Sequence, residues 1–105
     1  MKRIMYIENK ASGLDGPGRI GWVELSRSMR SFHYDGRCFQ KLRSGYKYNC
    51  VDVATGERYW ISGPKKNGRD RLYGGWVEID ENARQQYWTA IRRQPQSIDM
   101  ARYRS

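Results

Sequence analysis

The chain is poor in the residues that build metal and catalytic centres. Its 105 residues include one histidine, His33, and two cysteines, Cys38 and Cys50. Zinc sites need a set of closely spaced histidine or cysteine ligands, and calcium loops of the EF-hand type need regularly spaced acidic residues. Neither pattern occurs in this sequence. We therefore expect no metal ion and no other cofactor.

Long apolar runs are also missing. The first apolar stretch, Ile4 to Ile7, is far too short for the h-region of a signal peptide, and no stretch approaches the roughly 20 apolar residues of a membrane-spanning helix. Two cysteines in a chain with many other core candidates are typical of buried thiols in a reducing compartment. These features predict free thiols, a cytoplasmic protein and no membrane partner.

Two glycine-rich segments match nucleotide-binding motifs only in part. Residues 16–21 spell G-x-G-x-x-G, but they precede a predicted strand, whereas a dinucleotide-binding fold needs a helix N-terminus there. Residues 63–68 spell G-x-x-x-x-G, but Arg69 and Asp70 follow in place of the lysine and hydroxyl residue that bind phosphate and Mg²⁺. Both segments are therefore interpreted as turns, and ATP hydrolysis is not predicted.

Positive charge and aromatic rings are abundant. The chain has 20 lysine and arginine residues against 11 aspartate and glutamate residues, a net charge of +9, and 13% aromatic residues, four of them tryptophan. Such a charge favours polyanionic partners, either nucleic acid or an acidic protein. It is also compatible with a surface that only keeps the protein soluble. The rings suffice for the core of one small domain, which we place at residues 1–94.

Alternating apolar residues and turn signals predict several short strands, at residues 2–7, 19–26, 46–53, 58–62 and 76–79. Asp35-Gly36 is the signal of a type I′ hairpin, because both positions need positive φ. This turn sets three cross-strand pairs: Tyr34 with Arg37, His33 with Cys38, and Phe32 with Phe39. Gly56 is expected at the left-handed position of a second hairpin turn.

One helix is expected after the last strand. Asp80 is a candidate N-cap, Ala83, Tyr87 and Ile91 follow with helical spacing, and Pro95 prevents much continuation. We predict a helix over residues 81–93 and a loosely held tail over residues 95–105. With about six strands, this indicates a mainly β (α+β) fold: a small bent antiparallel sheet, or an SH3-like or OB-like barrel, with one C-terminal helix.

The strongest functional signal is the loop of residues 63–75, which follows Tyr59 and Trp60. Basic side chains can neutralise phosphates, turn residues can expose backbone N–H groups, and an aromatic ring can stack on a base. We assign nucleic-acid contacts in this loop to Lys65, Lys66, Asn67, Arg69, Arg71 and Tyr73. Because alternation puts Tyr59 and Trp60 on opposite faces, at least one of them is expected in the core. A second basic surface is predicted from Arg37, Lys41, Arg43 and Lys47.

Three functions stay open on these residues. The leading one is a non-enzymatic module that binds RNA or DNA through the basic aromatic loop. The second is a protein-interaction or regulatory accessory module whose exposed tyrosines and arginines contact a partner. The third is a small metal-independent ribonuclease that uses His33 with arginine and tyrosine side chains. The pair of His33 and Cys38 is a further arrangement for nucleophilic catalysis, but it has no evident orienting group.

The chain contains the segments RIMYIENK, GPGRIGWVELSRS and YWISGPKKNGRDRLYGG, followed by VEID and a YW-containing helix. In these segments, up to about Gln94, it resembles a family of small bacterial proteins of unassigned role. Some members carry the label 1-deoxy-D-xylulose-5-phosphate synthase, but such a synthase is a large thiamine-diphosphate enzyme, and this chain lacks its size and its metal-diphosphate motif. The resemblance therefore implies a bacterial cytoplasmic protein and supplies no catalytic residues.

Overall fold

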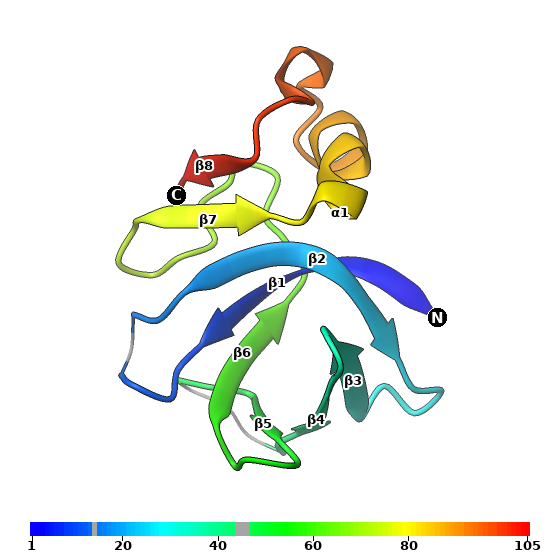
Figure 1. Cartoon of the computed structure of the whole chain (residues 1–105), viewed down its shortest axis with the longest axis vertical. Helices are drawn as coiled ribbons and strands as arrows, with labels where there is room; N and C mark the ends of the chain where they lie inside the picture. Colours follow the sequence, from blue (N-terminus) through cyan, green and yellow to red (C-terminus); the bar gives the residue numbers. More distant parts are fainter. Residues whose placement is uncertain (14, 44–46) are drawn as a thin grey trace.

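The computed structural model describes residues 1–13, 15–43 and 47–105 (Figure 1). These residues form one sheet with the strands β1 (Lys2–Asn9), β2 (Gly18–Leu25), β3 (Ser31–Tyr34), β4 (Arg37–Lys41), β5 (Cys50–Asp52), β6 (Arg58–Ser62), β7 (Trp76–Ile79) and β8 (Arg102–Arg104). The helical segments are α1 (Glu81–Gln86), the π-helical η1 (Tyr87–Ile91) and the 3-10 turn η2 (Pro95–Ser97).

The first six strands close into an antiparallel barrel. Each strand pairs with the next one in the sequence, and β6 pairs back onto β1. This confirms the prediction of a mainly β fold, and of the two predicted forms, a bent sheet or a barrel, the structure has the barrel. The strands follow one another as an up-and-down meander, whereas an OB-fold is a five-stranded Greek key.

The predicted hairpins are present. Asp35 and Gly36 have φ values of 51° and 73°, and the three cross-strand pairs around them are those that the turn predicts. Gly56, at φ 76°, occupies the left-handed position of the second turn. Of the strand expected over residues 46–53, only residues 50–52 form β5, and Tyr46 lies outside the described residues. Cys38 and Cys50 are free thiols, as predicted.

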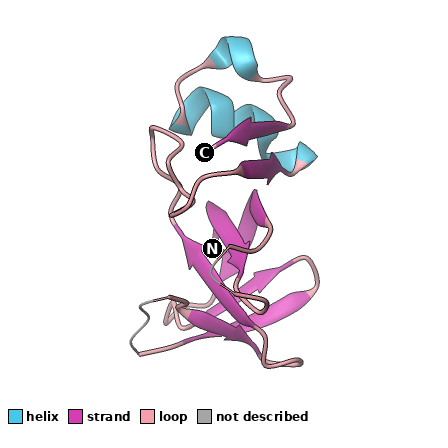
Figure 2. Ribbon diagram, turned by 90° about the vertical axis from the view of Figure 1, so that its left-hand side faces the viewer, coloured by secondary structure: helices cyan, strands magenta, loops and turns pink. Residues whose placement is uncertain are grey.

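Strand β2 is shared by the barrel and by a two-stranded extension. One edge of β2 pairs with β1, while its other edge pairs with β7 at residues 18–20 and with β3 at residues 24–25. β2 therefore curves strongly, and β7, β8 and the helical segments gather at one end of the molecule, with the barrel at the other (Figures 1 and 2). No helix in the described ranges is long and apolar enough to cross a bilayer.

The last residues are not loosely held. Residues 102–104 form β8, which pairs antiparallel with β7, so the prediction of a loose tail is wrong for this segment. The physical reason is the Tyr103 ring, which is 4% exposed and stacks on Tyr87 at 5.5 Å between ring centroids. Trp88 fixes the chain further upstream, because its indole Nε1 donates to the Met100 carbonyl at 3.0 Å.

Two apolar clusters flank β1 and β2, as expected for a first strand that is covered on both faces. The cluster inside the barrel comprises Met5, Ile7, Val23, Leu25, Phe32, Phe39, Cys50, Tyr59 and Ile61. The cluster between the sheet and the helical segments comprises Ile4, Tyr6, Ile20, Val77, Ile79, Ala83, Tyr87, Trp88 and Tyr103. Tyr59 belongs to the first cluster, while Trp60 is half-buried and packs against the second. This confirms the prediction that the two rings lie on opposite faces and that at least one of them is in the core.

The helix begins where it is predicted, but its end and the role of the Asp80 side chain differ from the prediction. It begins at Glu81, but its α-helical part ends at Gln86, and the following π-helical segment ends at Ile91. The Asp80 side chain makes no capping hydrogen bond. Its carboxylate instead accepts hydrogen bonds from Arg19 and Tyr34, which lie on β2 and β3. Asp80 therefore joins the helix start to the barrel.

Candidate nucleic-acid interface

The loop of residues 63–75 walls a cavity of about 760 Å³ against the ends of β1 and β6. We call it the basic cavity. Five cationic side chains line it: Lys10, Lys47, Lys65, Arg69 and Arg71. The carboxylates Glu8 and Asp70 and the rings of Trp60 and Tyr73 complete the main lining. Volumes of roughly 300–1,000 Å³ are typical of ligand pockets in proteins. The cavity therefore has both the size and the chemistry of a binding site.

The structure divides the predicted contact residues. It brings Lys65, Arg69, Arg71 and Tyr73 of the loop together with Lys47, which was assigned to a separate surface. Lys66 points elsewhere, toward a pocket that it shares with Trp22 and Gln86. Asn67 shapes the loop, because its Oδ1 accepts from the Arg69 backbone N–H at 2.9 Å.

The second predicted basic surface is not continuous. Arg37 is engaged by acidic side chains, with its Nη1 2.8 Å from Asp52 Oδ2 and 3.1 Å from Glu57 Oε1. Lys41 and Arg43 are exposed and do not line the basic cavity. Lys47 is thus the member of this group that lies beside the loop.

Buried groups hold the loop in place. The Asp70 carboxylate accepts from the Lys65 backbone N–H at 2.7 Å and from the Tyr103 hydroxyl at 2.6 Å. Burial and this carboxylate raise the pKa of Tyr103, so the hydroxyl stays protonated and donates. Gly68 has φ 75°, and a Cβ there would come within 2.4 Å of the Arg92 guanidinium. Arg92 in turn lies over three core rings, those of Tyr87, Trp88 and Tyr103.

Arg71 has a structural role that the sequence did not reveal. Its side chain is only 7% exposed, its Nε donates to the Gly74 carbonyl at 2.9 Å, and its Nη2 pairs with the Asp15 carboxylate. Gly18 lies close beside it, since a Cβ at that position would lie 2.7 Å from Arg71 Nη1. Gly18, the first residue of β2, therefore leaves room for Arg71.

Glu8 and Trp60 face each other across β1 and β6, at directly opposed positions of the two strands. Glu8 is 2% exposed and accepts hydrogen bonds from the Tyr6 hydroxyl and from Lys10 Nζ, each at 2.5 Å. Burial, and next the Glu8 carboxylate, raise the pKa of Tyr6, which keeps the hydroxyl protonated. The Trp60 indole is held by a 3.0 Å hydrogen bond to Ser62 Oγ. Glu8 was not predicted as a site residue from the sequence, although a carboxylate that follows an apolar stretch of a strand is a usable signal for one.

Exposed rings continue beyond the rim of the cavity. Tyr73 is 61% exposed, and Trp76, the first residue of β7, is 48% exposed. The guanidinium groups of Arg102 and Arg104 lie 4.4 and 5.7 Å from the centre of the Trp76 ring. This arginine and tryptophan surface depends on β8, and it was missed because residues 95–105 were expected to be loose.

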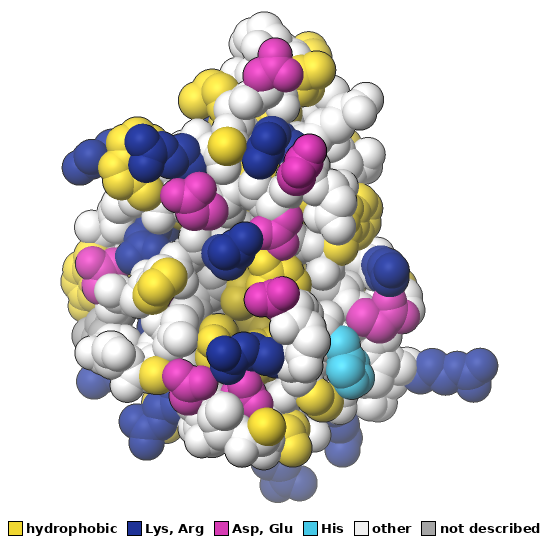
Figure 3. Space-filling model, viewed as in Figure 1, with side chains coloured by type: hydrophobic (Ala, Val, Ile, Leu, Met, Phe, Trp, Pro, Cys, Tyr) yellow, Lys and Arg dark blue, Asp and Glu magenta, His cyan; other side chains and the backbone are white. Residues whose placement is uncertain are grey.

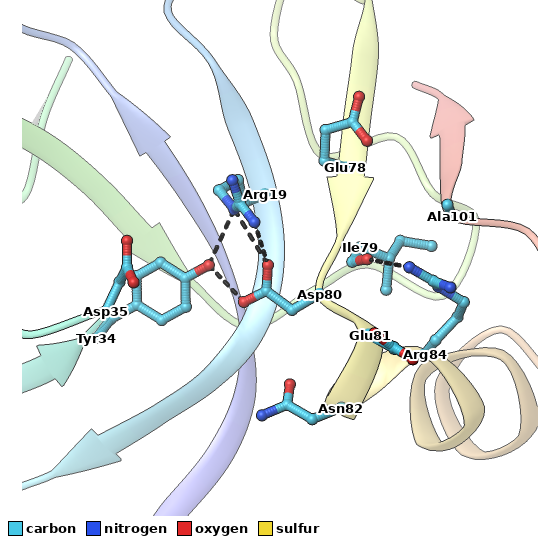
Figure 4. Close-up of a pocket in the computed structure, with 10 residues that line it drawn as sticks. All are labelled: Arg19, Tyr34, Asp35, Glu78, Ile79, Asp80, Glu81, Asn82, Arg84 and Ala101. Carbon is cyan, nitrogen blue, oxygen red and sulfur yellow. Dashed lines mark hydrogen bonds and ion pairs between the residues drawn. The ribbon is translucent and has the colours of Figure 1, made fainter.

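A second cavity, of about 640 Å³, has the opposite character. We call it the acidic cavity; Asp35, Glu78, Asp80 and Glu81 line it, with Arg19 and Arg84 as the cations (Figure 4). Arg19 Nη2 lies 2.6 Å from Asp80 Oδ1, and the Tyr34 hydroxyl donates to Asp80 Oδ2 at 2.6 Å. Burial and the Asp80 carboxylate raise the pKa of Tyr34, which remains a donor.

Neither member of the pair His33 and Cys38 lines the basic or the acidic cavity. The two residues are opposed across β3 and β4, as predicted, with Cys38 half-buried and His33 exposed. Figure 3 shows the histidine at the surface of a face on which acidic and basic side chains are interspersed, while other lysine and arginine side chains project from the margin. The described ranges contain no group of three or more His, Cys, Asp or Glu side chains placed to hold a metal ion.

Comparison with known proteins adds no relative to this picture: no protein-family model, no curated protein and no solved structure matches the chain. The two cavities are therefore the features of the structure that bear on function.

Proposed function

We propose that this protein is a small non-enzymatic module that binds nucleic acid, RNA or DNA, at the basic cavity and its loop. One observation carries the proposal: cations from distant parts of the sequence converge around exposed or half-exposed rings. Lys47 follows β4, whereas Lys65 and Arg69 belong to the loop before β7, and all three line one cavity with Trp60 and Tyr73. Such a combination suits phosphates and unstacked bases.

The charges of the loop are available to a partner. Lys65 and Arg69 are exposed, and neither makes an ion pair with any described residue. Each phosphate that such a cation neutralises releases condensed counterions, and this release supplies most of the sequence-independent affinity for nucleic acid. Because the two hydrogen bonds of Asp70 hold the loop, little ordering entropy is lost on binding.

A second candidate, a protein-interaction module, is favoured by Leu72. This residue lines the same cavity with 79% of its surface exposed, and an aliphatic side chain contributes little to phosphate or base recognition. The two candidates predict different responses to salt. Nucleic-acid binding falls steeply with salt because counterions are released, whereas a contact built around an apolar residue is much less sensitive.

The test is the salt dependence of binding to an unselected, fluorescently labelled single strand of about 12 nucleotides, measured by fluorescence anisotropy. We expect binding at low salt, and we expect Lys65→Ala combined with Arg69→Ala to reduce the slope of log K against log salt by about 1.4. The matched control is Arg27→Ala with Arg30→Ala, which removes the same charge from the exposed turn between β2 and β3. The proposal fails if the native protein does not bind at low salt, or if both double variants change the slope equally.

A further inference from the structure

Glu8 is an unusual residue to line a cavity that attracts polyanions. It follows the apolar stretch Ile4 to Ile7 of β1, it is 2% exposed, and it lies among cationic side chains. Burying a carboxylate costs free energy unless hydrogen bonds and an opposite charge compensate, and an apolar residue at such a position is often as stabilising. The presence of Glu8 in this cavity therefore suggests a role beyond the stability of the fold.

The hydrogen bonds of Glu8 leave it able to accept more. The Tyr6 hydroxyl donates to Oε1 and Lys10 Nζ donates to Oε2, so each oxygen is oriented by one donor. An ionised carboxylate has about four lone-pair sites, and each oxygen keeps a second one. Because two donors from the protein fix the carboxylate, it presents a rigid pair of acceptors to whatever occupies the cavity.

Among the common bases, guanine fits a fixed pair of acceptors best. Its Watson–Crick edge carries two adjacent donors, N1–H and the N2 amino group, whereas on the edges of adenine, cytosine and uracil each donor is flanked by an acceptor. Single-stranded nucleic acid is read through such edges while the base stacks on an aromatic ring. Trp60 lies directly opposite Glu8 across the two strands and lines the same cavity.

We infer that the basic cavity holds one unstacked guanine base, with Glu8 accepting from its N1–H and N2 amino groups and Trp60 stacking on its face. This inference rests on the proposed function, to which it adds the chemical class of the base. Lys65 and Arg69 belong to the loop that lines the cavity, and they are placed to contact the adjoining phosphates. The protein is then a nucleic-acid binder with a preference at a single position.

The experiment compares short labelled oligouridine strands that carry guanosine, inosine or uridine at the central position, at one salt concentration. A good bidentate contact discriminates by roughly tenfold, so the guanosine strand should bind about tenfold more tightly than the uridine strand. Inosine keeps N1–H but lacks the N2 amino group, and its strand should bind with intermediate affinity. Equal binding of the guanosine and uridine strands would overturn the inference and leave the proposed function intact, whereas no binding of any strand would overturn both.

Variants connect this preference to Glu8. Glu8→Gln replaces one acceptor with an amino group that opposes a guanine N–H, so the guanosine and uridine strands should bind equally well. Glu78→Gln is the control, because it makes the same change at an exposed carboxylate that lines the acidic cavity, and it should retain the preference. A Glu8→Gln protein that folds and still prefers guanosine contradicts the inference. If this variant does not fold, the inosine comparison on the native protein decides.

Free guanosine monophosphate, added as a competitor, identifies the source of the base. If it displaces the strand at concentrations near its own dissociation constant, measured with the native protein in the absence of a strand, the cavity serves a free nucleotide. If only a guanosine-containing strand competes, the base is read within a nucleic acid. Both results support the guanine site, and displacement by uridine monophosphate at the same concentration would contradict it.

Discussion

The basic and acidic cavities differ most in what their charged groups bind. In the acidic cavity, Arg19 and Tyr34 both bind Asp80, so Arg19 is paired with a carboxylate of its own chain. In the basic cavity, Lys65 and Arg69 have no ion-pair partner among the described residues. Cations that pair with carboxylates of their own chain stabilise the fold. Clustered cations that have no such partner are available to bind a polyanion.

The difference shows how a net charge of +9 should be interpreted. Arg37 and Arg71 contribute to that charge, yet both bind carboxylates of the same chain. Counting basic residues therefore overestimates the binding surface, and the distribution of ion pairs locates it. Of four experiments, taken from the largest expected effect to the smallest, three test whether the two cavities have separate roles, and the last concerns the barrel core.

Reversing the charge of the loop should have the largest effect. Lys65→Glu combined with Arg69→Glu makes the basic cavity acidic, and the loss of two charged contacts of about 1.5 kcal/mol each predicts roughly hundredfold weaker binding of a single strand. Arg27→Glu with Arg30→Glu reverses the same charge at the turn between β2 and β3 and should weaken binding far less. Equal losses in titrations of the two variants would show that only total charge matters.

Removing the charge of Asp80 should lower the stability of the fold without weakening the binding of a single strand. Asp80→Asn deprives Arg19 of its ion pair and weakens the hydrogen bond from Tyr34, which should lower the free energy of unfolding by about 1–2 kcal/mol. Urea unfolding measures this loss. Affinity for a single strand should not fall, because the acidic cavity lies outside the proposed site; a loss of affinity in the folded variant would break the distinction between the cavities.

Truncating an exposed ring separates stacking from charge. Tyr73→Ala should weaken binding about tenfold without altering the slope against salt, since stacking on an aromatic ring contributes about 1–3 kcal/mol per base. The unfolding free energy should be unchanged, because Tyr73 is 61% exposed. If the variant instead changes the salt slope and leaves affinity at one salt concentration intact, Tyr73 does not stack on a base.

A change of pH should affect the barrel core and neither cavity. Burial raises the pKa of Cys50 to about 12, whereas a free thiol titrates near pH 8.5. The folded pKa is the higher one, so the stabilisation is complete below about pH 8.5 and is lost as pH rises toward 12. From pH 7.5 to 9 the unfolding free energy should fall by at most about 0.8 kcal/mol. Urea unfolding of Cys50→Ala should lack this decrease; an equal decrease would assign it to other groups.

Local signals in the sequence predicted local structure well. The turn at Asp35 and Gly36 set the register of β3 and β4, because both positive φ values and the side-chain alternation depend on neighbouring residues. The helix start was also predicted, but Asp80 binds Arg19 and Tyr34 through the fold, and no local pattern reveals such partners.

The sequence predicted the loop of the candidate site, but it assigned Lys47 to a separate surface and did not indicate Glu8. Lys65, Arg69 and Tyr73 are close in the sequence, whereas Lys47 and Glu8 reach the same cavity because β6 closes the barrel onto β1. Likewise, β8 forms because the Tyr103 ring is buried beside Tyr87, a contact that no tail composition indicates. Barrel closure and burial of one ring are non-local events, and they account for what the sequence did not reveal.

The most direct test of the account is to titrate isotope-labelled protein with a short single strand and to follow its amide and indole NMR signals. We predict that the Trp60 indole N–H and the backbone amides of residues 63–75 shift with the strand concentration, while the amides of residues 78–82 beside the acidic cavity do not. Shifts centred on the amides near Asp80, with the Trp60 indole unchanged, would contradict the assignment of binding to the basic cavity.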